Sequence, residues 1–166
     1  MSGIIGLAGI GGKSGVVGPP PAFVVKFAGD GYDVNVTNII YKFDTILEDH
    51  YGGFDNTDSN YKFTIPVAGV YQFNYSGRFS AAAGDWRAYE LWIQANETTT
   101  IGEASIAFGE TDDISGSNHP GMSMSTMYYM SAGDRVRVFH AGHRSSEQGL
   151  EASGTHQWFS GHWICP

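Results

Sequence analysis

Residues 61–77 read Tyr-Lys-Phe-Thr-Ile-Pro-Val-Ala-Gly-Val-Tyr-Gln-Phe-Asn-Tyr-Ser-Gly, and they carry the strongest pattern in this chain of 166 residues. Aromatic and aliphatic residues alternate with other residues on both sides of residues 66–69. This period predicts two β-strands, each with one buried face. Because Pro66 cannot donate to a strand ladder and Gly69 can take a positive φ, we expect the chain to change direction between the strands.

The composition favours one all-β domain. Aromatic residues make up 14% of the chain, 23 residues are glycine, and no long run has the period of an amphipathic helix. Many short alternating runs of this kind are typical of a sandwich of two sheets. Further runs at residues 23–27, 89–95, 122–130 and 158–164 predict other strands of that sandwich.

The charge pattern excludes two classes of partner. The formal net charge is -8, and Lys and Arg form no cluster. Nucleic acids and anionic membrane surfaces both select basic patches, so we expect neither as a partner. The sequence after Met1 has neither a basic segment nor an unbroken apolar run, so we expect no secretory signal and no membrane span. We therefore expect synthesis in a cytoplasm followed by assembly.

A series of short motifs resembles a known family. In chain order they are Phe43-Asp44, Ile46-Leu47, Phe54-Asp55, Tyr61-Lys62-Phe63, Pro66-Val67-Ala68-Gly69, Tyr71-Gln72-Phe73, Ser131-Ala132-Gly133-Asp134-Arg135-Val136 and Phe159-Ser160-Gly161. Their order and spacing resemble the signature of C1q domains over residues 22–164. The resemblance implies an all-β jelly-roll sandwich of the C1q and tumour-necrosis-factor class. It also implies a homotrimer with apolar and aromatic side chains along the three-fold axis, and both termini at one end of the sandwich.

Glycine recurs at every third position before this domain. The six residues are Gly3, Gly6, Gly9, Gly12, Gly15 and Gly18. Only glycine fits at the axis of a three-chain helix of the collagen type, so this register independently suggests three chains. The other triplet positions are mostly apolar, including Ile4, Ile5, Leu7 and Ile10. Such triplets, nearly without proline, would not form a stable triple helix alone, so we expect a partner protein to hold this segment.

Three interpretations of residues 3–18 stay open: a glycine-axis bundle sunk into another protein, an extended anchor with a partly coincidental register, and a disordered glycine-rich tail. The start of the chain also resembles the N-termini of tail and fibre proteins of marine bacteriophages. Three consecutive prolines at residues 19–21 predict a stiff spacer. We therefore divide the chain into an anchor and spacer, residues 1–21, and a jelly-roll domain, residues 22–166.

No motif supplies the machinery of an enzyme or a metal site. The sequence has no Gly-X-Ser-X-Gly elbow, and its single cysteine, Cys165, has no local signature of a nucleophile. His140 and His143 lack the spacing of a structural zinc site. Residues 55–60 lack the glycine of a calcium-binding loop, so we expect a turn there. We predict a non-enzymatic protein without a cofactor, and only an ion held by one histidine from each of three copies stays open.

Two long polar connections, residues 106–119 and 141–157, form the predicted recognition surface. Alternate loops of antiparallel strands emerge at the same end of a sandwich, so the two connections should lie together. Their candidate binding residues are Glu110, Asp112, Asp113, His119, His143, Arg144, Glu147, Glu151 and His156. Long polar loops on a rigid scaffold often carry binding, and plain solvated loops are the equal alternative.

The leading functional hypothesis is a bacteriophage virion component, either a short fibre or a capsid decoration. It would dock through residues 1–21 and present the domain outward for host attachment, with a cell-surface glycan as a candidate ligand. One alternative is a soluble extracellular C1q-like protein that recognises glycans or other surface ligands. A second alternative is a fibre protein of the bacterial spore surface.

Overall fold

The computed structural model describes residues 18–28, 39–57, 60–81, 86–96, 105–114, 121–144, 150–152 and 156–166. These residues form strands and connections, and none of them lies in a helix. In the described part of the chain there is accordingly no helix that could cross a membrane. Residues 1–17, which hold most of the predicted glycine register, lie outside the described residues.

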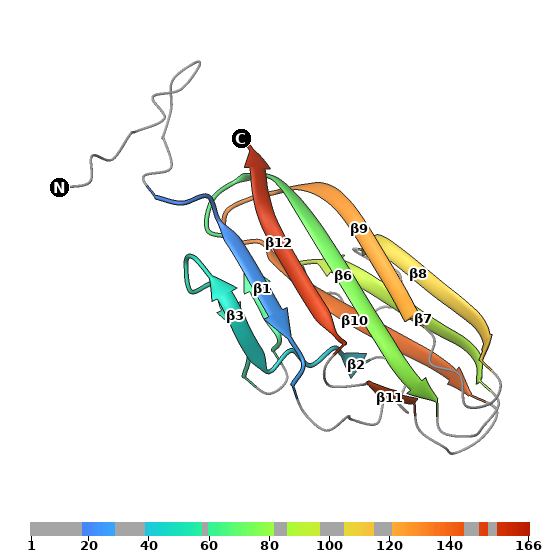
Figure 1. Cartoon of the computed structure of the whole chain (residues 1–166). Coiled ribbons are helices and arrows are strands. Elements are labelled where there is room, and N and C mark those ends of the chain that lie inside the picture. The colour runs from blue at the N-terminus through green and yellow to red at the C-terminus, as the bar shows by residue number, and fades with distance from the viewer. Residues whose placement is uncertain are drawn as a thin grey trace.

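Two antiparallel sheets form the domain (Figure 1). The front sheet has the order β3-β1-β12-β6-β9, and β11 pairs with the far end of β6. The back sheet has the order β4-β5-β10-β7-β8, and β2 pairs with β10. The front-sheet strands are β1 (Ala22–Lys26), β3 (Thr45–Asp49), β6 (Gly69–Ala81), β9 (Gly121–Met130), β11 (Leu150–Ala152) and β12 (Trp158–Cys165). The back-sheet strands are β2 (Ile39–Ile40), β4 (Phe54–Asp55), β5 (Lys62–Thr64), β7 (Trp86–Ala95), β8 (Ser105–Ile114) and β10 (Arg135–Arg144).

The core between the sheets is an aromatic stack. The Phe23 ring lies 4.2 Å from Phe63 and 5.1 Å from Phe159, measured between centroids. On its other side, Phe159 stacks on Phe43 at 5.7 Å. All four side chains are at most 1% exposed. Since each aromatic ring buries about 150–250 Å², this stack supplies a large share of the apolar area removed from water.

The stretch at residues 61–77 has the predicted structure. Tyr61, Phe63 and Ile65 are buried on one side of the turn, and Tyr71, Phe73 and Tyr75 are buried on the other. The two strands belong to different sheets, so residues 65–68 carry the chain across the sandwich. At this crossing the Tyr71 hydroxyl donates to the Val67 carbonyl at 2.7 Å, and Gly69 has a φ of 151°.

The prediction that residues 106–119 form a polar connection is wrong for its first part. Residues up to Ile114 belong to β8, which pairs with β7 from Gln94↔Ser105 to Trp86↔Ile114. The prediction for residues 141–157 fails in the same way, because β10 continues to Arg144 and pairs with β7 from Val136 to Arg144. The acidic second half of β8 disfavours a central strand, but β8 is an edge strand, where charged residues are common.

Candidate interaction surfaces

Those predicted binding residues that the structure describes lie toward one end of the sandwich, on strands as well as beyond them. Glu110, Asp112 and Asp113 lie on β8, His143 and Arg144 on β10, and Glu151 on β11. The described and exposed His156 precedes β12, whereas His119 and Glu147 lie outside the described residues. We call this end, where β6, β8 and β10 finish, the loop end.

The strand register brings two of the predicted residues into one row. On β7, Ala88 pairs with His143 of β10 on one side and with Asp112 of β8 on the other. The backbones of His143 and Asp112 are therefore about two strand spacings apart, roughly 10 Å. Glu151 lies in the other sheet, opposite Ser80 of β6.

The two ends of the domain lie opposite the loop end. At the start of β1, Ala22 pairs with His162, and near the end of β12, Cys165 pairs with Val70. Because Val70 is at the start of β6 and the loop end is at its finish, residues 1–21 join the domain at the far side from the predicted binding residues (Figure 1). This confirms the topology expected from the resemblance.

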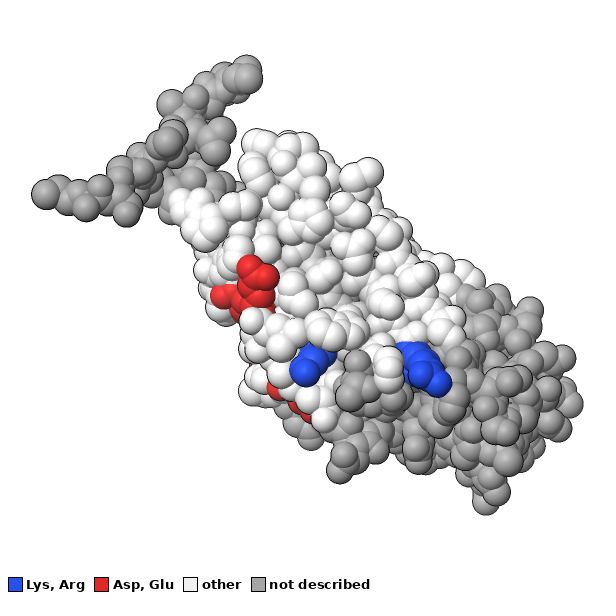
Figure 2. Space-filling view, viewed as in Figure 1, with Lys and Arg blue, Asp and Glu red and all other residues white. Residues whose placement is uncertain are grey.

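A large part of the front sheet's outward face is free of charged side chains, which gather toward β3 and at a few other positions (Figure 2). Neither β9 nor β12 contains Lys, Arg, Asp or Glu. Met127 and Tyr129 alternate with the buried methionines of β9 and are 68% and 58% exposed. Tyr128, at the open edge of the sheet, is 46% exposed. Depletion of charge and enrichment of Met and Tyr are typical of the centre of a protein–protein interface.

A second apolar patch lies at the opposite edge of the same sheet. Ile46 and Leu47 of the edge strand β3 are exposed, and so is Trp158 on β12. Three strands separate β3 from β9, so the two patches are about 19 Å apart. We call the first, Met127 to Tyr129, the β9 patch and the second, Ile46 and Leu47, the β3 patch.

The middle of the front sheet is polar between these patches. Ser125 donates to Asn74 at 2.9 Å, and the Gln72 amide lies 3.3 Å from Asn74 and 3.4 Å from Ser125. His162 is also exposed here, on β12. Among the described residues, no group of three or more His, Cys, Asp or Glu side chains is arranged to hold a metal ion.

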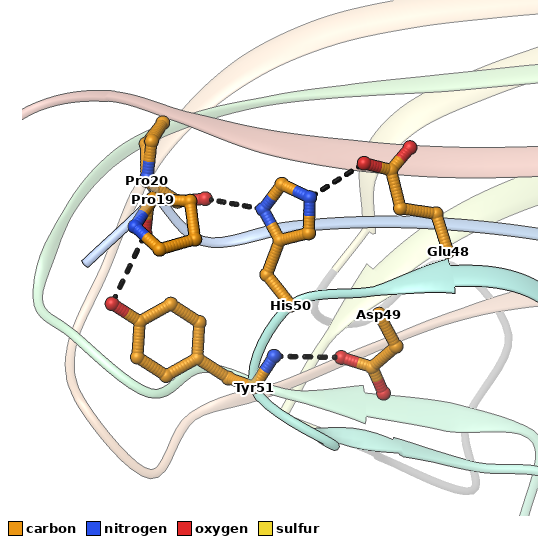
Figure 3. Close-up of polar contacts among 6 residues, drawn as sticks. All are labelled: Pro19, Pro20, Glu48, Asp49, His50 and Tyr51. Atoms are coloured by element: carbon orange, nitrogen blue, oxygen red, sulfur yellow. Dashed lines mark hydrogen bonds and ion pairs between the residues drawn. The ribbon is translucent and has the colours of Figure 1, made fainter. Parts of the chain in front are cut away.

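The proline spacer is fastened to the domain by a cluster that the sequence did not indicate (Figure 3). The Tyr51 hydroxyl donates to the Pro19 carbonyl at 3.1 Å, and His50 Nδ1 lies 2.9 Å from the Pro20 carbonyl. The other ring nitrogen of His50, Nε2, lies 2.5 Å from Glu48 Oε1. These residues are about thirty positions from the spacer, so local patterns could not have revealed the contact.

The described residues of the turn predicted at residues 55–60 are joined by local hydrogen bonds, and residues 58 and 59 lie outside the described part of the chain. Asp55 Oδ1 accepts from the Thr57 hydroxyl at 2.6 Å and from its backbone N–H at 3.0 Å. The Asn60 N–H closes the turn on the Thr57 carbonyl at 3.0 Å. The hydroxyl and N–H donors of Thr57 hold the pKa of Asp55 below its usual value, because they stabilise the carboxylate.

The back sheet carries an aromatic cluster on its outward face that the sequence also did not reveal. Phe139 pairs with Ile40 on one side and Trp92 on the other, and Trp92 pairs with Phe108. The Trp92 ring lies 5.6 Å from Phe108 and 6.1 Å from Phe139. Trp92 and Phe139 are buried, whereas Phe108 is 53% exposed. The sequence signal for this cluster was Trp92, a large apolar residue on the face of β7 that otherwise carries Glu90 and Gln94.

Comparisons with known proteins agree with this architecture. No family model and no curated protein sequence matches the chain. Among solved structures, the chain is similar to the globular domain of zebrafish complement 1qA, with a TM-score of 0.62 and 20% identity over 87% of this chain and 97% of that one. Murine APRIL, at pH 5.0, gives a TM-score of 0.62 at 7% identity, over 87% of this chain and 99% of that one. The fold is therefore a jelly roll of the C1q and tumour-necrosis-factor type, as the motifs predicted.

Proposed function

We propose that this chain is a non-enzymatic recognition protein that works as a closed ring of three copies. In this proposal, residues 1–21 fasten the trimer to a bacteriophage virion, and the loop end faces outward and binds a surface ligand such as a glycan. The observation that carries it is the pair of apolar patches on the two edges of one sheet, whose strands β9 and β12 contain no charged residue.

Two unlike patches favour a ring over a two-fold dimer. A two-fold interface uses the same patch on both copies, whereas a head-to-tail interface joins two different patches and closes when the rotation allows it. The β9 patch of one copy would pack on the β3 patch of the next, and three such contacts would close the ring. The exposed apolar residues that this would cover are large, and Met and Tyr are favoured at such contacts.

The attachment through residues 1–21 is supported by composition and by position. The glycine register and the apolar residues between the glycines suit a segment that three chains hold together inside a partner. The spacer joins the domain opposite the loop end, so an anchored trimer would point the loop end away from the particle. In this orientation the loop end stays accessible to a ligand, and loops on a rigid scaffold often carry binding.

Two measurements test the proposal separately. Light scattering at micromolar concentration should give the mass of three chains, and a monomeric mass would refute the ring. Deletion of residues 1–21 should leave a folded trimer that no longer joins virions, with the full chain carrying the same purification tag as the control. Normal incorporation of the shortened chain would refute the anchor, and a cross-linker placed at Ile5 would identify the protein that holds it.

A further inference from the structure

The spacer contact contains two hydrogen-bond acceptors that compete for the protons of one histidine. The Pro20 carbonyl oxygen faces His50 Nδ1 at 2.9 Å, and the Glu48 carboxylate faces Nε2 at 2.5 Å (Figure 3). A neutral imidazole carries one N–H and one bare nitrogen, so it can donate to only one of them. The imidazolium carries two N–H groups and satisfies both acceptors. The geometry is thus complete only when His50 is protonated.

Neighbouring contacts confine the effect to the outer part of the spacer. The Trp163 N–H donates to the Pro21 carbonyl at 2.8 Å, and the His50 N–H donates to the Ala22 carbonyl at 3.1 Å. Both are backbone donors and do not titrate. The chain is therefore fixed to the domain from Pro21 onward at any pH near neutrality, while Pro20 depends on the His50 ring.

We propose that His50 is a proton-operated latch, which holds Pro20 to the domain as an imidazolium and releases it as a neutral imidazole. When one proton leaves, the remaining N–H stays with Glu48, because a carboxylate is the stronger acceptor. The Pro20 carbonyl then faces a bare ring nitrogen and loses its donor. Among the described residues, the Tyr51 hydroxyl, which donates to the Pro19 carbonyl, then still restrains this part of the spacer.

The charges around His50 act in the same direction. β3 contributes the negative charges of Glu48 and Asp49, and the spacer contributes the Pro20 carbonyl that faces Nδ1. The hydrogen bond to Pro20, followed by that to Glu48, raises the pKa of His50 above its ordinary 6.5. A raised histidine pKa means that the contact is complete below pH 6.5 and is lost as the pH rises through the higher value.

The consequence for the assembly rests on the proposed function, because the latch would set the direction in which residues 1–17 leave the domain. Gly18, two residues before Pro20, has a φ of 153°, a backbone conformation that residues other than glycine rarely adopt. Protonation would hold the trimer at a fixed angle on its anchor, and deprotonation would let it swivel. A change of pH would thereby alter how far the loop end can reach.

The test uses NMR on the full chain with ¹⁵N-labelled histidine. Below the transition both ring nitrogens of His50 should show imidazolium shifts, and its pKa should lie above 6.5. The heteronuclear NOE of the Gly18 amide should fall as the pH rises through that same pKa. A His50 pKa at or below 6.5, or a Gly18 NOE that stays constant while His50 titrates, would overturn the latch.

Three variants separate the latch from a general effect of pH. His50→Gln should make the Gly18 NOE independent of pH, and Glu48→Gln should lower the pKa of His50 by removing the facing charge. Tyr51→Phe, the matched control, removes a spacer contact without touching the His50 ring, so the pH dependence should persist. All of these measurements use the free chain. A result that overturns the latch therefore does not bear on the proposed virion anchor, and a result that overturns the anchor does not bear on the latch.

Discussion

The β9 patch offers the sharpest prediction about assembly. Replacing Met127 by lysine places a charge at the centre of the proposed contact with the β3 patch. Met127 is 68% exposed in the single chain and lies on the outward face of β9, so the change should leave the fold of each chain intact. The trimer should weaken strongly, because a charged side chain would have to be desolvated in an apolar contact.

The size of the effect follows from the exposed area. Full burial of a methionine side chain contributes about 1.5–3 kcal/mol, and roughly two-thirds of it is available at Met127, which gives about 1–2 kcal/mol for each contact. A ring of three copies has three such contacts, so the loss is about 3–6 kcal/mol per trimer. At about 1.4 kcal/mol per tenfold change, the trimer dissociation constant should rise about 100- to 10,000-fold.

Sedimentation equilibrium over a range of chain concentrations measures this change. The matched control is Ser123→Lys, which puts the same charge on the same face of the same strand, outside the β9 patch. Leu47→Asp should weaken the trimer as Met127→Lys does, and the two together should recover part of the loss, because unlike charges would then meet. An unchanged dissociation constant for Met127→Lys would refute the head-to-tail contact, as would equal losses for the control.

Three further changes test the fold around these surfaces. Gly161→Ala should lower the free energy of unfolding by about 1–3 kcal/mol in urea titrations, because the new methyl carbon would lie 2.8 Å from the Phe73 ring; an equally stable variant would show that the core can yield. Burial raises the pKa of Tyr71 from its ordinary 10.0 to about 12. The free energy of unfolding should therefore decrease as the pH rises from 10.0 to about 12, and Tyr71→Phe should abolish this decrease. Asp49→Asn should cost about 1–3 kcal/mol, since one carboxylate accepts two backbone N–H groups at 2.8 and 3.3 Å; thermal unfolding without a shift would contradict it.

Alternation in the sequence was sufficient to predict the strands that line the core. Phe63 and Phe73 are buried, as the alternation in residues 61–77 predicted, and Phe23 and Phe159, which lie in runs predicted to be strands, are buried as well. Every second side chain of a strand points to the same face of the sheet. A strand with one buried face therefore needs an apolar residue at every second position, which can be seen in the local sequence. The jelly-roll class followed from the order of these strands together with the motifs between them.

The strand boundaries at the loop end could not be predicted in this way. β8 is polar and acidic along much of its length, and β10 ends in Ala-Gly-His-Arg. Both are strands because β7 provides hydrogen-bond partners for them on its two sides, and the partners of β10 lie far earlier in the chain. The same limit hid the contact between His50 and Pro20, which joins residues 30 positions apart.

The position of β1 determines how the domain would withstand a pull through residues 1–21, the proposed anchor. β1 begins directly after the spacer, pairs with β12 over five residues and with β3 on its other side, and runs toward the loop end. A force between the anchor and a ligand at the loop end would act along this strand. Antiparallel hydrogen bonds lie across the strands, so such a force would load the bonds of β1 together in shear and would not open them one by one. The proposed attachment and a mechanically resistant geometry of the sheet would thus coincide in one strand.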